Sequence, residues 1–164
     1  MTKYAVMALS GGMDSTGLLM HLIAEGYTVH ALSYDYGQKH KLELERAKAN
    51  IEYLADNNIQ VSQKIVDLQS AMAIFHSALT TEGYDVPEGH YEEEQMKQTV
   101  VPNRNAIFSS VLYGYALSIA TRENSNVKIA LGVHSGDHAI YPDCRPEFYE
   151  ALEHAFQVGN WDSD

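Results

Sequence analysis

The segment ALSGGMDST (residues 8–16) decides the fold expected for this chain. It follows the apolar run YAVM (residues 4–7), which predicts a buried strand, and it leads into GLLMHLI (residues 17–23), which predicts a helix. Two adjacent glycines at such a turn allow backbone conformations that are closed to other residues. Several main-chain N–H groups can then point at one anion, assisted by the helix dipole. The segment therefore predicts a phosphate-binding turn, although not a Walker A loop, because the lysine of GxxxxGKS or GxxxxGKT is absent.

Strand and helix patterns alternate along the rest of the chain. Further strands are predicted over residues 27–34, 59–66 and 127–133, and helices over residues 42–54 and 105–122 and from Pro146 onward. In the long helix, apolar pairs recur every four residues, which indicates one buried face. The pattern predicts an α/β fold with a mainly parallel, twisted sheet and helices on both faces, a Rossmann-like architecture. Ligands of such sheets bind beyond the carboxyl ends of the strands.

Length and composition limit the classes of protein to consider. The 164 residues predict a single domain over residues 1–164, without an apolar run long enough to span a bilayer and without a signal peptide. The sole cysteine, Cys144, excludes an intramolecular disulfide and favours a reducing, cytoplasmic location. A net charge of −11 argues against a general nucleic-acid binder, but not against a small anionic substrate. The eight histidines show no paired metal-ligand spacing, so no metal site is predicted.

One stretch interrupts the alternation. Residues 76–100 have weak periodicity and include the acidic cluster at residues 92–94. A solvated acidic loop explains this composition, and a lid over a nucleotide site explains it as well.

Two short motifs follow a strand or begin a helix. In DYGQKH (residues 35–40), Gly37 permits a tight turn, Tyr36 can stack on a ring and Gln38 can hydrogen-bond. In VPNRN (residues 101–105), Arg104 offers a planar, permanently charged fork for phosphate oxygens. The alternative for Arg104 is an ordinary surface arginine.

A third motif, GVHSGDHAIYPDCRPEF (residues 132–148), leaves the last predicted strand and enters a helix at Pro146. A carboxylate in this motif can accept the adjacent N–H groups of a guanine-like ring, and Arg145 suits a carboxylate on the ligand. A polar loop in which Asp143 caps the following helix is the alternative, and it is compatible with binding.

The string SGGMDS resembles the phosphate loop of the ATP pyrophosphatases. Together with DYGQKH, VPNRN and YPDCRPEF, in this order, it resembles the 7-cyano-7-deazaguanine synthase family of the queuosine and archaeosine pathways, over essentially the whole chain. The resemblance implies an adenine nucleotide alpha hydrolase-like fold. It also implies an ATP-dependent ligase that converts 7-carboxy-7-deazaguanine and ammonia into 7-cyano-7-deazaguanine through adenylated intermediates.

The resemblance also implies site residues. Asp14 and Arg104 are the candidate catalytic residues; Asp14 is expected to help place Mg²⁺ or, alternatively, to cap its helix. The candidate ATP-binding residues are Leu9, Ser10, Gly11, Gly12, Met13, Asp14, Ser15, Thr16, Gly17, Leu18, Leu19, Tyr36, Gly37, Gln38 and Arg104. The candidate substrate-binding residues are Gly132, Asp137, Tyr141, Asp143, Arg145 and Glu147, with Cys144 expected to pack within the same loop.

The chain departs from the family in one respect. Family members continue into a segment with four cysteines that bind structural zinc, whereas this chain has one cysteine, so zinc is unsupported and a truncated form is expected. The expected partners are the small substrates, with ammonia taken up free or from another protein. Neither nucleic acid nor a membrane is an expected partner, and the family's homodimer is a candidate assembly.

Two other functions remain open at this point. One is a different ATP pyrophosphatase, either tRNA-modifying or deazaguanine-transferring. The chain lacks the basic surface and the cysteine pairs expected of a tRNA-thiolating enzyme. The other is a non-catalytic nucleotide-binding module.

Overall fold

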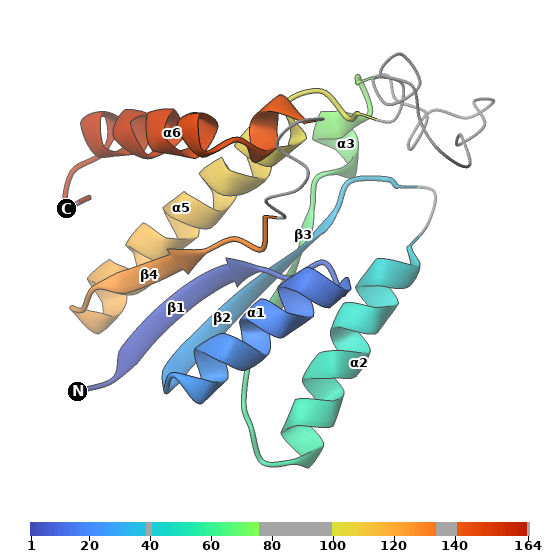
Figure 1. Cartoon of the computed structure of the whole chain (residues 1–164), viewed down its shortest axis with the longest axis vertical. Coiled ribbons are helices and arrows are strands. Elements are labelled where there is room, and N and C mark those ends of the chain that lie inside the picture. Colours follow the sequence, from blue (N-terminus) through green and yellow to red (C-terminus); the bar gives the residue numbers. More distant parts are fainter. Residues whose placement is uncertain (39–40, 76–99, 134–140, 164) are drawn as a thin grey trace.

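Figure 1 shows the computed structural model of the chain, which describes residues 1–38, 41–75, 100–133 and 141–163. Within these ranges the strands are β1 (Lys3–Ala8), β2 (Tyr27–Asp35), β3 (Ser62–Asp67) and β4 (Val127–Ala130). The helices are α1 (Met13–Ala24), α2 (Leu42–Asp56), α3 (Gln69–Met72), α5 (Arg104–Glu123), the 3-10 turn η2 (Pro142–Cys144) and α6 (Pro146–Gly159). The predicted acidic loop over residues 76–100, apart from its last residue, lies outside the described residues.

The described strands form one sheet in the order β3-β2-β1-β4, and every neighbouring pair is parallel. On the central strand β1, Ala5, Val6 and Met7 are completely buried. A parallel strand covered on both faces gains from apolar side chains in every position. This explains why β1 reads in the sequence as a continuous apolar run.

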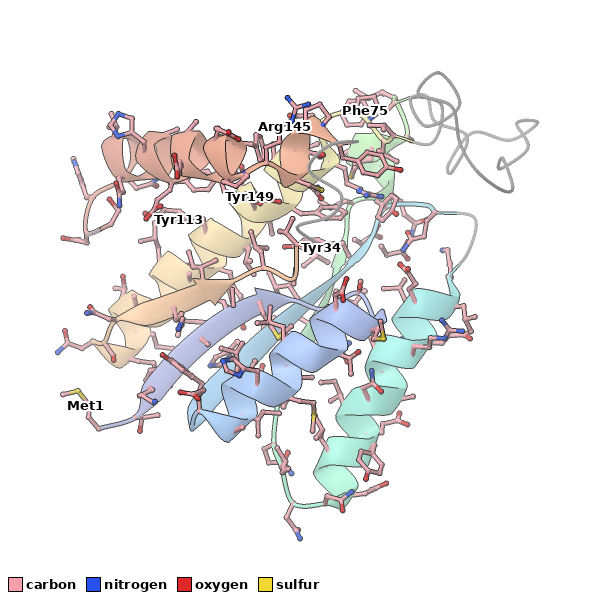
Figure 2. The ribbon with its side chains drawn as sticks, in the orientation of Figure 1. Met1, Tyr34, Phe75, Tyr113, Arg145 and Tyr149 are labelled. Carbon is pink, nitrogen blue, oxygen red and sulfur yellow. The ribbon has the colours of Figure 1, made fainter. Side chains whose placement is uncertain are left out.

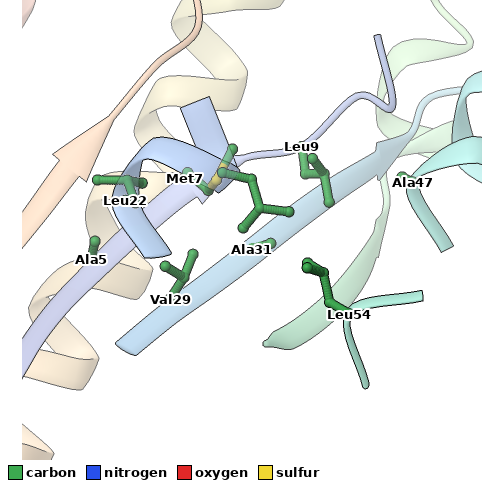
Figure 3. Packing of buried hydrophobic residues seen from close by; sticks show 9 residues of the cluster. Ala5, Met7, Leu9, Leu22, Val29, Ala31, Ala47 and Leu54 are labelled. Carbon is green, nitrogen blue, oxygen red and sulfur yellow. The ribbon is translucent and has the colours of Figure 1, made fainter. Parts of the chain in front are cut away.

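Helices α1 and α2 cover one face of the sheet, and α5 covers the other (Figure 1). Successive strand residues point to opposite faces. Met7 therefore belongs to the cluster that includes Leu19 of α1 (Figure 3), whereas Val6 belongs to the cluster that includes Leu112 and Ile119 of α5. The predicted α/β fold, with a parallel sheet and helices on both faces, is confirmed.

Two predicted strands are shorter than expected. The strand predicted from residue 59 begins at Ser62, because the preceding residues close the end of α2: the Ile59 N–H donates to the Leu54 carbonyl at 2.9 Å. The strand predicted to reach residue 133 ends at Ala130, and the chain then turns toward the N-terminus of α1. The short elements α3 and η2 were not predicted, since neither is long enough to show a periodic pattern.

Helix α6 packs loosely on the rest of the molecule. None of its side chains is buried, and its main aromatic contact is the stacking of Phe156 on Tyr113 of α5, with ring centroids 4.5 Å apart. Pro146 occupies its first turn, where the missing N–H would have had no helical partner. In the part of the chain that the structure describes, no helix is long and apolar enough to cross a membrane.

Candidate functional site

A cavity of about 290 Å³ lies at the carboxyl ends of β1, β2 and β4. Its walls come from the turn before α1, the turn after β2, the first turns of α5, the chain after β4 and the start of α6. This is the edge at which parallel α/β sheets bind their ligands. The cavity is therefore the candidate functional site.

A larger hollow of about 510 Å³ lies between α5, β4 and α6. Its described lining includes the acidic residues Glu153 and Asp162 and contains no lysine or arginine. A triphosphate needs donors and positive charge, which the smaller cavity offers through Arg104 and the turn before α1. We therefore assign the candidate site to the smaller cavity.

The turn before α1 is held by hydrogen bonds among its own serines. The Ser15 Oγ accepts the Ser10 N–H at 3.2 Å and lies 3.0 Å from the Ser10 Oγ, which accepts the Gly12 N–H at 3.2 Å. Helix α1 begins with Gly12 as its N-cap, and no side chain caps it. The alternative in which Asp14 caps the helix is therefore wrong, because Asp14 lies inside the first turn.

Gly11 joins this turn to helix α2. Its φ is +83°, a left-handed conformation that side chains disfavour. A Cβ at this position would overlap the Glu43 carbonyl oxygen and lie 2.7 Å from the Ala47 nitrogen. In addition, the Asn50 side chain donates to the Thr16 Oγ1 at 3.1 Å. The shape of the phosphate turn thus depends on α2, which the local sequence does not reveal.

Arg104 stands at the first position of α5. Asn103 has a left-handed φ of 58°, Val101 is buried, and the Arg104 N–H donates to the Val101 carbonyl at 3.2 Å. The Arg104 Nη1 donates to the hydroxyl of Tyr36 at 3.2 Å. The guanidinium therefore lines the cavity with its orientation set by a neutral partner.

The turn after β2 is built by Gln38, which is buried. Its Oε1 accepts the Tyr36 N–H at 3.0 Å, and its Nε2 donates to the Tyr34 carbonyl at 3.3 Å. Gly37 has a φ of +81°, and its N–H donates to the Asp35 carboxylate at 3.3 Å. The side-chain amide of Gln38 is thus engaged on both sides by the main chain of its own turn.

Aromatic rings form one wall of the cavity. Tyr34 stacks on Phe108 with ring centroids 4.0 Å apart and an interplanar angle of 4°, and the Tyr36 ring is tilted against Phe108 at 5.5 Å. The Tyr34 hydroxyl donates to the Phe108 carbonyl at 2.8 Å, and burial raises the pKa of Tyr34 well above its usual range. Tyr34 is therefore a neutral structural donor in this wall.

The main chain after β4 passes close to the first turn of α1 and so reaches the cavity. A Cβ on Gly132 would lie 3.3 Å from the Ser15 Cα and 3.4 Å from the Ser15 nitrogen. Farther along, Cys144 and Tyr149 line the cavity, and Figure 2 shows Tyr149 on the side of α6 that faces the sheet. Partial burial, and to a smaller extent the nearby Cys144 and Asp143, raise the pKa of Tyr149 to about 12.

The structure brings together part of the predicted set. The predicted residues that line the cavity are Leu9, Ser10, Asp14, Ser15, Tyr36, Gln38, Arg104 and Gly132. Those outside its lining are Gly11, Gly12, Met13, Thr16, Gly17, Leu18, Leu19, Gly37, Tyr141, Asp143, Arg145 and Glu147. Asp137 lies outside the described residues.

The predicted residues outside the lining have different positions. Leu19 is in the core, whereas Arg145 is exposed and points away from the sheet in Figure 2. Arg145 is also the N-cap residue of α6, which has no side-chain cap. The alternative in which Asp143 caps this helix is therefore wrong.

Several lining residues were missed by the sequence reasoning. They are Ala8, Tyr34, Glu43, Leu44, Asn105, Phe108, Ser109, Leu131, Val133 and Tyr149. Helical spacing is the signal that could have found two of them: Phe108 and Ser109 follow Arg104 and Asn105 by four residues and lie on the same face of α5. Tyr149, by contrast, depends on how α6 packs.

The carboxylates of the cavity decide which metal ions it suits. No cluster of three or more His, Cys, Asp or Glu side chains occurs within the described ranges. Mg²⁺, however, is commonly held by one or two carboxylates together with substrate phosphates. Asp14 and Glu43 are acidic residues of the cavity lining, so the residues present fit Mg²⁺. They do not fit a four-cysteine zinc site, since the chain has one cysteine.

Comparison with known proteins identifies the family of this chain. The family model described as "Queuosine biosynthesis protein QueC" matches residues 4–164. A 7-cyano-7-deazaguanine synthase of Pseudoalteromonas translucida is 44% identical over 163 residues, which are 99% of this chain and 70% of that relative. A synthase of the same name from Alteromonas mediterranea is 46% identical over 161 residues, which are 98% of this chain and 69% of the relative.

Among solved structures, a predicted subunit of tRNA methyltransferase from Methanocaldococcus jannaschii is similar to this chain with a TM-score of 0.52. The two are 15% identical, and the match covers 94% of this chain and 64% of that one. At this identity the likeness concerns the fold alone.

Proposed function

Because the chain belongs to the QueC family of queuosine biosynthesis proteins, we propose that it is an ATP-dependent ligase that makes 7-cyano-7-deazaguanine from 7-carboxy-7-deazaguanine and ammonia. One observation supports this most strongly. Ser10 and Ser15 of the turn before α1 and Arg104 line one cavity at the carboxyl edge of the sheet. That combination suits a polyphosphate whose charge must be stabilised during bond breaking.

ATP is proposed to bind with its pyrophosphate portion against the turn before α1. The main chain of residues 10–15 and the N-terminus of α1 supply N–H donors and a positive dipole. Ser10 and Ser15 add hydroxyls that now bond to each other at 3.0 Å. On binding, these hydroxyls would exchange their mutual hydrogen bond for phosphate oxygens.

The chemistry begins with a substrate carboxylate, which is a poor electrophile. Its oxygen attacks the α-phosphorus of ATP, so that a C–O–P bond forms and the bond to pyrophosphate breaks. Ammonia then displaces AMP to give an amide and releases a proton. The amide oxygen then attacks the α-phosphorus of a second ATP and releases a second pyrophosphate, and elimination of AMP with loss of the amide protons leaves the nitrile.

The chain's own groups act mainly by electrostatics. Negative charge grows on the departing pyrophosphate and on the α-phosphoryl group, where Arg104 and the main-chain N–H groups stabilise it. Asp14 and Glu43 would hold Mg²⁺, which supplies further neutralisation of the phosphate oxygens when bound. The aromatic wall of Tyr34 and Phe108 helps to exclude water, which would hydrolyse an adenylate.

The deazaguanine is proposed to bind on the side of the cavity formed after β4. Gly132 and Tyr149 line that side. Asp137, Tyr141, Asp143, Arg145 and Glu147 belong to the same motif and remain the proposed substrate-binding set. In this assignment the carboxylates of the motif accept the ring N–H groups of the substrate.

We also propose a cytoplasmic enzyme that acts on small molecules without direct contact to nucleic acid. The net charge of −11 supports this, because a phosphate backbone rewards clustered lysine and arginine. A homodimer is the proposed assembly.

Pyrophosphate release, measured with ATP, Mg²⁺, ammonia and 7-carboxy-7-deazaguanine, tests the function. We expect two pyrophosphates for each nitrile detected by mass spectrometry, and none when the deazaguanine is omitted. Nucleotide binding without release, in a folded protein supplied with every substrate, would instead indicate a non-catalytic module. Release with a different acceptor would indicate another ATP pyrophosphatase.

A further inference from the structure

We propose that the turn after β2 acts through Arg104: Tyr36 is a positioning residue that fixes the guanidinium, and Gln38 fixes Tyr36. This inference rests on the proposed function, in which Arg104 faces the reacting phosphates. It assigns to the turn a role other than direct contact with ATP.

The contact between Arg104 and Tyr36 has a particular electrostatic character. The Arg104 Nη1 donates to the Tyr36 hydroxyl at 3.2 Å, and the Cζ lies 5.7 Å from the centre of the Tyr36 ring. With the described carboxylates Arg104 forms no ion pair. A neutral partner orients the guanidinium without neutralising its charge, and the fork has four further N–H donors for a ligand.

Tyr36 is itself fixed from two directions. Its ring is tilted against Phe108 of α5, with centroids 5.5 Å apart. Its N–H donates to the Oε1 of Gln38 at 3.0 Å, and the Nε2 of Gln38 is tied to the Tyr34 carbonyl at 3.3 Å. A buried amide with both ends engaged is poorly placed to bind ATP without breaking this turn.

The backbone of Arg104 is fixed independently of Tyr36. Asn103 adopts a left-handed conformation, and its carbonyl accepts the Ile107 N–H at 3.0 Å. Val101 is 2% exposed and anchors the segment in the core. The remaining freedom of Arg104 is in its long side chain, whose end only Tyr36 holds among the contacts of the described residues.

The substitution Tyr36→Phe isolates this role, because it keeps the ring and removes the acceptor. We expect kcat for pyrophosphate release to fall about three- to tenfold, which is the loss of one hydrogen bond. We expect the KM for ATP to change by less than about twofold, because the loss concerns the transition state. An unchanged kcat would overturn the assignment, and a rise in the KM for ATP alone would instead indicate direct contact with ATP.

A double-mutant cycle separates positioning of Arg104 from an independent role of Tyr36. If Tyr36 acts through Arg104, Tyr36→Phe has no further effect on kcat in the Arg104→Ala background. Additive losses would show an independent role and refute the proposal. Tyr115→Phe is the matched control, since Tyr115 lies on α5 near His30, away from the cavity, and we expect kcat to stay unchanged.

A second readout does not need turnover. Nitrogen-15 NMR of the Arg104 guanidinium reports whether its terminal groups rotate freely. We expect restricted rotation in the wild-type chain and fast rotation in Tyr36→Phe; the same behaviour in both would refute the positioning role. If the wild-type chain releases no pyrophosphate, the proposed function is refuted. The NMR spectra would still show whether Tyr36 holds the guanidinium of Arg104.

Discussion

The turn before α1 and the chain after β4 both connect a strand to a helix at the same edge of the sheet, yet they form the cavity differently. The turn before α1 is held by hydrogen bonds among Ser10, Gly12 and Ser15 and by packing on α2. The chain after β4 contributes Gly132 by close approach to that turn, and then Cys144 and Tyr149. The first region is shaped by contacts within one short turn and with α2, whereas the second depends on residues that η2 and α6 bring to the cavity.

This difference explains why the two motifs are unequally informative. A main-chain anion site needs glycines at fixed positions, and these are visible in the sequence. A side-chain site depends on which way each residue faces after packing. The following predictions test this contrast, beginning with the largest expected effect.

Gly11→Ala should disrupt the turn before α1. The left-handed φ costs about 1–2 kcal/mol for a residue with a Cβ, and the overlap with α2 costs about 1–3 kcal/mol. We expect the free energy of unfolding, measured by urea denaturation, to fall by about 2–5 kcal/mol, with loss of ATP binding. Gly17→Ala is the control, because a Cβ there meets nothing within 4 Å, and it should stabilise α1 by about 0.5–1 kcal/mol. A loss below about 1 kcal/mol for Gly11→Ala would show that the turn can relax.

Arg104→Ala should show how much of the catalysis comes from the charge of Arg104 and how much from the turn before α1. We expect about 2–4 kcal/mol less transition-state stabilisation, measured as kcat/KM for pyrophosphate release. Arg122→Ala, in the last turn of the same helix, is the control and should change the rate by less than about twofold. A change below about threefold for Arg104→Ala would remove the guanidinium from the reacting centre.

Asp143→Ala tests the second region. If Asp143 accepts the ring N–H groups of the substrate, the KM for 7-carboxy-7-deazaguanine should rise about tenfold or more, because a charged hydrogen bond is lost. The KM for ATP should change by less than about twofold. Steady-state kinetics with each substrate varied in turn measure both values. Equal rises would mean that Asp143 shapes η2 and does not contact the substrate.

Tyr149→Phe should have the smallest effect. Burial and the neighbouring Cys144 and Asp143 raise the pKa of Tyr149 from 10.0 to about 12. The folded state therefore favours the protonated hydroxyl. This contribution to the free energy of unfolding is complete below pH 10.0, the pKa of the unfolded chain, and is lost as the pH rises toward 12. We expect the ratio of wild-type to variant kcat to stay constant between about pH 6 and about pH 9. A ratio that changes across this range would show that Tyr149 transfers a proton.

Most of the fold was predictable because local patterns and packing agree. The apolar run of β1 and the four-residue repeat of α5 both follow from burial, and the structure places them at Lys3–Ala8 and Arg104–Glu123. Strand ends were less predictable, because helix closure at Ile59 competes locally with the strand pattern and the close approach of Gly132 to α1 is a tertiary effect. Asp137 lies outside the described residues, so its role stays a prediction.

The sequence by itself determined the parallel α/β architecture and the phosphate turn, because periodic burial and glycine freedom are properties of short segments. Only the tertiary structure decided that Gly11 packs on α2, that Tyr36 holds Arg104, and that Tyr149 enters the cavity while Arg145 faces outward. Those contacts join residues far apart in the chain, and their formation depends on how helices and strands pack. No local pattern encodes that packing.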